Sequence, residues 1–182
     1  TRMRELETMI ESYSSMVERN TRELQREKER VEKLLLNIMP RSVYEEYKTF
    51  GTVTPQSYEP VSVLTLDFVD FDETAREVGP AVMVSEMNDI YAAFDRIGEQ
   101  FGCERIITVG DSYVAISGLP EPMDDHAESI ANAALRFVRY LQRRNDSHPH
   151  SWKCRIGLAS GSVIGSVVGI QKYVYDVFGP AV

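Results

Sequence analysis

The fold is organised around residues 61–69, VSVLTLDFV, a run made almost entirely of aliphatic, aromatic and β-branched side chains. Continuous apolar runs of this length are typical of strands covered on both faces. We therefore predict a buried strand over Val61–Val69. It ends in a carboxylate, Asp67, and follows a turn-rich loop through Pro55 and Pro60.

After this strand, helical and extended patterns alternate along the chain. Pro80 begins a predicted helix to about Phe101, and two short strands are joined by a tight turn at Gly110-Asp111. The inner side of that helix is predicted to carry Val82, Met83, Met87, Ile90, Tyr91, Phe94 and Ile97. The other predicted elements are a helix over 41–47, strands over 104–109 and 112–117, a helix over 124–144, a loop over 145–150 with solvated histidines, and β structure over 152–159, 163–168 and 173–178. This order predicts an α+β fold, a ferredoxin-like or palm-type sandwich whose antiparallel-rich sheet has helices on one face.

The first forty residues carry a different pattern, a heptad repeat without Gly or Pro before Pro40. Apolar residues occupy most of the seam positions, which are 3, 10, 17, 24, 31 and 38 together with 6, 13, 20, 27 and 34. We predict a long parallel coiled-coil helix over 1–40 and a catalytic domain over 41–182. Asn20 and Glu27 interrupt the seam, which fits either a plain dimer clamp or a helix that shifts register to carry a signal. Both readings require a partner chain.

Composition limits the class of protein. Of the 182 residues, 43% are hydrophobic and 26% are charged, as in a globular domain, and the net charge of -8 argues against a general nucleic-acid binder. The two cysteines have no metal-ligand spacing, which fits a reducing cytoplasm. No apolar run is long enough to span a membrane and no signal peptide is visible. The chain reads as part of a longer protein, so an upstream sensor and membrane attachment of the parent stay open.

Two carboxylates are candidates for chemistry. Asp67 ends the first buried strand, and Asp111 lies at the tip of the predicted hairpin. If that strand pairs beside the hairpin, the two carboxylates meet at one edge of the sheet. Carboxylates in such a pair suit hard divalent cations such as Mg²⁺ or Mn²⁺, which in turn bind phosphate oxygens.

Four ordered segments carry a resemblance. They are LDFVDF at 66–71, TVGDSY at 108–113, CRIGL at 154–158 and YDVFG at 175–179, with LLLNIMP at 34–40 leading in. Together they resemble the catalytic domain of class III adenylyl and guanylyl cyclases, which follows a signalling helix. The resemblance covers Leu34 to Val182.

The resemblance implies a head-to-tail homodimer that converts a nucleoside triphosphate into a 3′,5′-cyclic nucleotide and pyrophosphate. Asp67, Asp111 and the carbonyl of Phe68 would hold two divalent cations, Mg²⁺ or Mn²⁺. The turn from Phe68 to Asp72, with Val69, Asp70 and Phe71, would bind the triphosphate through backbone N–H groups. The partner chain would supply Ile107 and Asp176 to the purine.

This chain departs from the family at three points. Asp70 replaces a usual glycine, and Ile107 replaces the Lys of adenylyl or the Glu of guanylyl cyclases. The chain also ends before the family's Asn and Arg, which orient the ribose and stabilise the transition state. Asp176 still favours ATP over GTP, because a carboxylate accepts a hydrogen bond from the adenine amino group but not from the guanine carbonyl.

Three alternatives accompany the adenylyl cyclase reading. One is a guanylyl cyclase, and another is a catalytically inactive cyclase-like module that dimerises or regulates a competent chain. The third is a diguanylate cyclase or a polymerase palm, which the sequence disfavours because the hairpin reads TVGDSY and lacks a Gly-Gly-Asp/Glu-Glu-Phe motif.

Overall fold

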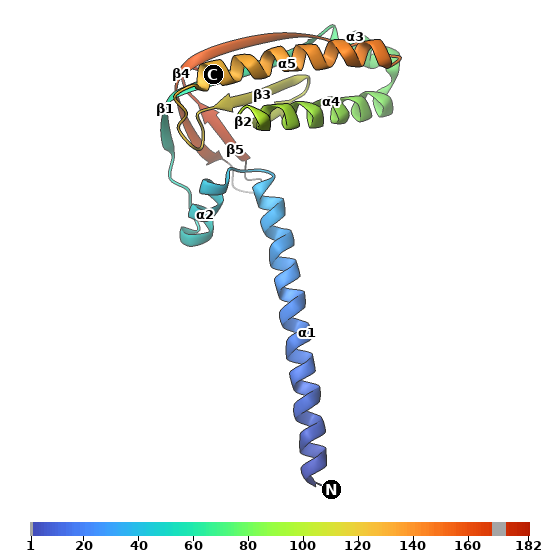
Figure 1. The fold of residues 1–182 in the computed structure, drawn as a ribbon, viewed down its shortest axis with the longest axis vertical. Helices are drawn as coiled ribbons and strands as arrows, with labels where there is room; N and C mark the ends of the chain where they lie inside the picture. Colours follow the sequence, from blue (N-terminus) through green and yellow to red (C-terminus); the bar gives the residue numbers. More distant parts are fainter. Residues whose placement is uncertain (1, 169–173) are drawn as a thin grey trace. The chain divides into compact units, whose positions relative to one another are not determined.

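The computed structural model describes residues 2–168 and 174–182, which divide into two compact units, Thr1–Thr49 and Phe50–Val182. The first unit holds helix α1 (Arg2–Leu36) and nearly all of helix α2 (Arg41–Phe50). The second unit holds the sheet and the helices that cover it (Figure 1). None of the described helices is long and apolar enough to cross a membrane.

Helix α1 is a single unbroken helix with no buried residue (Figure 1). Good helix formers, chiefly Glu, Arg, Lys and Leu, fill it between the seam positions. Its apolar seam is exposed to solvent along its length, namely at Met3, Leu6, Ile10, Tyr13, Val17, Leu24, Val31 and Leu34. A stripe of large exposed apolar side chains is suited to protein–protein contact. The parallel coiled coil itself stays a prediction.

The second unit is built on five antiparallel strands in the order β2-β3-β1-β4-β5. Their bounds are β1 Gln56–Val69, β2 Cys103–Val109, β3 Ser112–Ser117, β4 Lys153–Val168 and β5 Val174–Phe178. The chain crosses from β1 to β2 through α3 (Phe71–Val78) and α4 (Pro80–Gln100), and from β3 to β4 through α5 (His126–Ser147). This split βαβ arrangement confirms the predicted α+β sandwich.

One face of the sheet packs against the helices. Leu64, Leu66 and Phe68 of β1 point into this core, and the rings of Phe94 (α4) and Phe137 (α5) stack within it at 4.4 Å. Alternate residues of a strand point to opposite faces. Asp67 therefore lies on the other face, which we call the open face and define by Thr65 and Asp67 of β1, Ser112 and Val114 of β3, and Arg155 and Gly157 of β4.

Several predicted boundaries were wrong. β1 begins at Gln56 rather than at Val61, because a register shift between Tyr58 and Val61 accommodates Pro60, which lacks an N–H. β4 is one continuous strand where two were predicted. Its glycines allow close contacts, since a Cβ at Gly165 would collide with the Tyr175 hydroxyl.

The helices also differ from the prediction. The turn predicted after Val69 leads into an additional helix, α3, and α5 extends to Ser147. Val82 is 41% exposed and therefore does not lie on the inner side of α4. Tyr173, predicted to begin the last strand, lies outside the described residues.

A buried ionic cluster ties α4, α5 and the start of β4 together. Glu86 accepts hydrogen bonds from Trp152 Nε1 at 2.8 Å and forms an ion pair with Arg144 at 3.2 Å. His150 Nδ1 lies 3.2 Å from the same carboxylate, so this histidine is not simply solvated as predicted. Burial would raise the pKa of Glu86, but hydrogen bonds from Trp152, His150 and Arg144 outweigh burial and lower it.

Candidate nucleotide and metal site

Asp67 lies between two partners on the open face. The β1 register places it opposite Ser112 on β3 and opposite Arg155 on β4. The Ser112 hydroxyl donates a hydrogen bond to Asp67 Oδ1. Directly paired residues of antiparallel strands share a face, so the exposed Arg155 stands on the same face as this carboxylate. Asp67 is therefore oriented by the Ser112 hydroxyl, and the register places a basic residue next to it on the neighbouring strand.

Asp111 reaches the same edge of the sheet through the β2–β3 hairpin. Gly110 takes up a positive φ of 61° there, which a tight turn requires and glycine permits. Asp111 directly precedes Ser112, the cross-strand partner of Asp67. Both carboxylates also act on one hydroxyl: burial raises the pKa of Tyr91 to about 12, and the negative charges of Asp111 and Asp67 add to the rise. The register thus brings Asp111 and Asp67 to the same edge of the sheet.

The connection from β1 to α3 is anchored on the core side. Phe68 is buried, and its ring lies 6.3 Å from that of Phe71 and 5.7 Å from that of Trp152. Between them, Val69 is half-buried and Asp70 is exposed. Two buried or half-buried rings therefore hold the short segment that contains the exposed Asp70.

Asp70 adopts a left-handed conformation, φ 54° and ψ 35°. Glycine, the residue that the resemblance leads us to expect here, takes up this conformation without strain. Asp and Asn are the side chains that tolerate it best, since their short polar groups bond locally. Asp70 is therefore compatible with the backbone, and its effect on the site is one of charge.

The first N–H groups of α3 lie next to this residue. Asp70 is the N-cap of α3, and its side chain makes no capping hydrogen bond. Uncapped N–H groups at a helix N-terminus are donors for anions such as phosphate. They adjoin a pocket of about 320 Å³ that is lined by Asp70, Phe71, Asp72, Glu73, Arg76 and Asp111. The pocket joins the start of α3 to the hairpin carboxylate.

The predicted purine-contacting residues lie on other strands. Ile107 follows a register shift in β2 and pairs with Val114, which places it on the open face. Asp176 is half-buried in β5, and its Oδ1 accepts a hydrogen bond from Val177 N at 2.8 Å. β5 contacts β2 although the two strands stand at opposite ends of the strand order. The strands carrying Ile107 and Asp176 thus meet within one chain.

Sequence reasoning did not assign four residues near the carboxylates. Ser112 and Arg155 are the cross-strand partners of Asp67. Tyr91 has a buried hydroxyl, and Arg76 lines the pocket at the start of α3. Ser112 and Arg155 stand within the quoted motifs, but only the pairing of strands shows that both flank Asp67.

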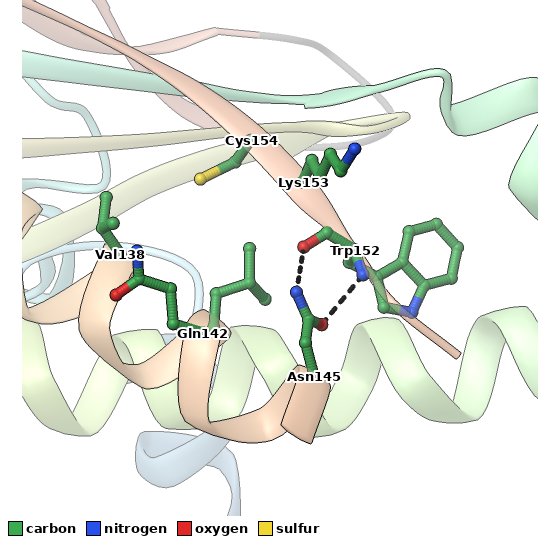
Figure 2. A pocket seen from close by; sticks show the side chains of 7 residues that line it. Val138, Gln142, Asn145, Trp152, Lys153 and Cys154 are labelled. Atoms are coloured by element: carbon green, nitrogen blue, oxygen red, sulfur yellow. Dashed lines mark hydrogen bonds between the residues drawn. The ribbon is translucent and has the colours of Figure 1, made fainter. Parts of the chain in front are cut away.

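A second pocket, between α5 and the start of β4, has a different character (Figure 2). Its lining residues are Val138, Leu141, Gln142, Asn145, Trp152, Lys153 and Cys154. Asn145 closes one side by bonding both backbone groups of Trp152, at 2.8 Å to O and 2.9 Å to N. No carboxylate lines this pocket, so it does not suit metal-assisted chemistry.

The carboxylate edge fits cations that are shared with a ligand. Among the residues that the structure describes, no group of three or more His, Cys, Asp or Glu side chains could by itself hold a metal ion. Mg²⁺ is commonly bound by one or two carboxylates, with substrate phosphates and water completing its shell. Asp67, Asp111 and the Phe68 carbonyl match that donor set, and Asp111 also lines the pocket at the start of α3.

Comparison with known proteins identifies the family. Residues 53–182 match the family described as the adenylate and guanylate cyclase catalytic domain. An adenylate cyclase of Mycobacterium tuberculosis is 37% identical over 160 residues, 87% of this chain and 36% of its own length. The receptor-type guanylate cyclase gcy-28 of Caenorhabditis elegans is 34% identical over 182 residues, 99% of this chain and 14% of its own. The chain thus spans about a third and a seventh of these relatives.

A solved structure agrees with the sequence comparisons. The guanylate cyclase domain of RhGC from Catenaria anguillulae, in complex with GTP, superposes with a TM-score of 0.67 at 28% identity and covers 70% of each chain. The relatives therefore include both adenylate and guanylate cyclases, and the resemblance of the four motifs is confirmed. With 53–182 matched as a catalytic domain, this protein belongs to the class III nucleotidyl cyclases.

Proposed function

We propose that this domain forms a 3′,5′-cyclic nucleotide and pyrophosphate, with ATP as the preferred substrate, at the interface of a homodimer. The proposal rests mainly on the shared edge where Ser112 links Asp67 to the Asp111 hairpin. Asp67, Asp111 and the Phe68 carbonyl would hold two divalent cations, Mg²⁺ or Mn²⁺. When bound, these cations supply charge neutralisation on the phosphates and a lower pKa for the ribose hydroxyl.

The residues of the chain mainly position the substrate. N–H groups at the start of α3 bind phosphate oxygens, and Ser112 keeps the Asp67 carboxylate oriented. The ribose 3′-oxygen gives its proton to water and attacks the α-phosphorus, while the bond between that phosphorus and the oxygen bridging to the β-phosphate breaks and pyrophosphate leaves. Such a reaction gains most from alignment and from charge placed before the reaction begins.

Asp176 carries the expected base preference. Its carboxylate can accept from the adenine amino group, whereas the guanine carbonyl would leave two acceptors facing each other. A site with such an unpaired acceptor rejects the wrong base strongly. Ile107 adds no hydrogen bond to either base, so the preference rests on one contact.

We expect the full-length protein, supplied with Mn²⁺, to form cyclic AMP about tenfold or more faster than cyclic GMP, because one unpaired buried acceptor costs about 1–3 kcal/mol. Product formation from each nucleotide, measured by chromatography, gives the ratio. In Asp176→Asn the side-chain amide can donate a hydrogen bond to the guanine carbonyl, so the ratio of cyclic AMP to cyclic GMP formation is expected to fall. Equal rates for the wild-type protein would contradict the ATP assignment, and faster formation of cyclic GMP would support the guanylyl alternative.

A non-enzymatic cyclase-like module is the second candidate. The acidic Asp70 and Asp72 line the pocket that would receive phosphate, and like charges repel. This reading expects no cyclic product from either nucleotide with either cation. The same assay on the full-length protein therefore separates the two candidates.

The N-terminal helix supports the dimer. Its exposed seam offers a long apolar stripe, and isolated helices with such a stripe gain their stability from a partner. The alignment with gcy-28 covers 99% of this chain, so it extends over α1. We propose a parallel two-stranded coiled coil that holds the two catalytic domains together.

Val17→Glu tests this dimer. Placing two carboxylates opposite each other in the seam is expected to weaken self-association about 100-fold or more, since buried unpaired charges cost several kcal/mol. Analytical ultracentrifugation of the chain measures the dissociation constant. Ser15→Glu, at an outer heptad position, is the matched control and should leave it unchanged. A monomeric wild-type chain, or equal dissociation constants for both variants, would contradict the coiled coil.

A further inference from the structure

The pocket beside the carboxylates carries an unfavourable charge for its proposed ligand. Asp70, Asp72, Glu73 and Asp111 line it, and a triphosphate is itself strongly anionic. Divalent cations held at Asp67 and Asp111 would offset part of this repulsion. The carboxylates of Asp70 and Asp72 stand at the phosphate-binding segment itself, so the charge there needs a counterpart.

Arg76 is the one cation among the residues that line this pocket. It stands one turn after Asp72 on α3, and its Nε donates a hydrogen bond to the Asp72 carbonyl oxygen at 3.0 Å. That bond uses one of the five guanidinium N–H groups and fixes the direction of the side chain. Within residues 2–168 and 174–182, Arg76 forms no ion pair at 4.0 Å or less.

A tethered guanidinium with free N–H groups is suited to phosphate. Arginine binds phosphate oxygens through two parallel hydrogen bonds, which gives both charge and orientation. The purely structural role of Arg76 would be to bond the Asp72 carbonyl and screen nearby acids on the helix surface. That role uses only Nε and does not explain why Arg76 lines the same pocket as Asp111.

We propose that Arg76 binds a terminal phosphate of the nucleoside triphosphate, offsetting the charge of Asp70 and Asp72. This inference rests on the proposed function of the same pocket. It makes Arg76 a substrate-binding residue that discriminates triphosphates from nucleotides with a single phosphate. The α-phosphate and base contacts are independent of it.

The test compares two nucleotides on the full-length protein with Mn²⁺ by isothermal titration calorimetry. Arg76→Gln is expected to weaken binding of a non-cyclisable ATP analogue, 3′-deoxy-ATP, about 10- to 100-fold, the range of a lost charged hydrogen bond. Binding of 3′-deoxy-AMP should change less than about twofold. Arg76→Lys should recover part of the affinity, because it keeps the charge but not the fork. Arg136→Gln, an exposed arginine on α5, is the matched control.

The outcomes separate this inference from the proposed function. If wild-type protein binds the triphosphate analogue and Arg76→Gln binds it equally well, Arg76 has no phosphate role while the proposed function stands. Equal weakening of both nucleotides would mean that Arg76 only maintains the local fold, which also overturns the inference. If the wild-type protein binds neither nucleotide, the proposed function fails and Arg76 has no substrate to contact. Thermal unfolding of each variant verifies that it is folded.

Discussion

Asp67→Ala is expected to lower the rate of cyclic-nucleotide formation by at least about 10³-fold, equivalent to about 4 kcal/mol of transition-state stabilisation. Asp67 accepts a hydrogen bond from the Ser112 hydroxyl, which orients its carboxylate at the site. Removing it takes away one of the two side-chain ligands proposed for the divalent cations. Steady-state product formation by the full-length protein with Mn²⁺ measures the loss.

The control variant removes the same negative charge at a position outside the site. Asp146→Ala deletes an exposed carboxylate on α5 and should retain wild-type activity within about twofold. Ser112→Ala should lie between the two, because it leaves Asp67 in place but unoriented. Activity of Asp67→Ala within tenfold of wild type would show that the carboxylate edge is not the reaction site.

Glu86→Ala is expected to destabilise the second unit by about 3–5 kcal/mol, which is the usual cost of leaving one partner of a buried ion pair uncompensated. Arg144 is only 4% exposed and would lose its carboxylate, and Trp152 Nε1 would lose its acceptor. Urea unfolding followed by fluorescence of Trp152, the single tryptophan, reports on this unit. A decrease in the free energy of unfolding below about 1 kcal/mol would mean that water or a local rearrangement replaces the interactions of the Glu86 carboxylate.

The same cluster should give a dependence of stability on pH. The pKa of Glu86 is lowered in the folded state, so its contribution is complete above the pKa of the unfolded carboxyl. It is lost as the pH falls through the lower folded value. Glu99→Ala, an exposed carboxylate on the same helix, should change stability by no more than about 0.5 kcal/mol and leave the acid limb unchanged.

Local sequence patterns predicted the helices and strands better than the pairing between the strands. The apolar run at 61–69 and the Gly110-Asp111 turn were sufficient for the central strand and the hairpin, because both depend on neighbouring residues alone. The register between strands depends on the whole sheet. No local pattern indicates that Asp67 faces Ser112 on one side and Arg155 on the other.

Two further differences have physical causes. Gly161 and Gly165 resemble breaks between strands, yet they lie inside β4, where Ala181 and Tyr175 approach the backbone closely. Helix α3 is only eight residues long, and helices this short depend on tertiary packing rather than on propensity. Arg76 therefore could not be placed on the pocket from the sequence. Its position follows from α3 and from the bond to Asp72.

The central claim is that Asp67 and Asp111 jointly hold divalent cations together with a nucleoside triphosphate. Electron paramagnetic resonance of Mn²⁺, titrated into the full-length protein with 3′-deoxy-ATP, measures the number of bound ions directly. Two ions per nucleotide are expected for the wild-type protein, with affinity reduced at least about tenfold in both Asp67→Ala and Asp111→Ala, because each variant removes one of two anionic ligands. Unchanged Mn²⁺ binding in both variants would contradict the claim.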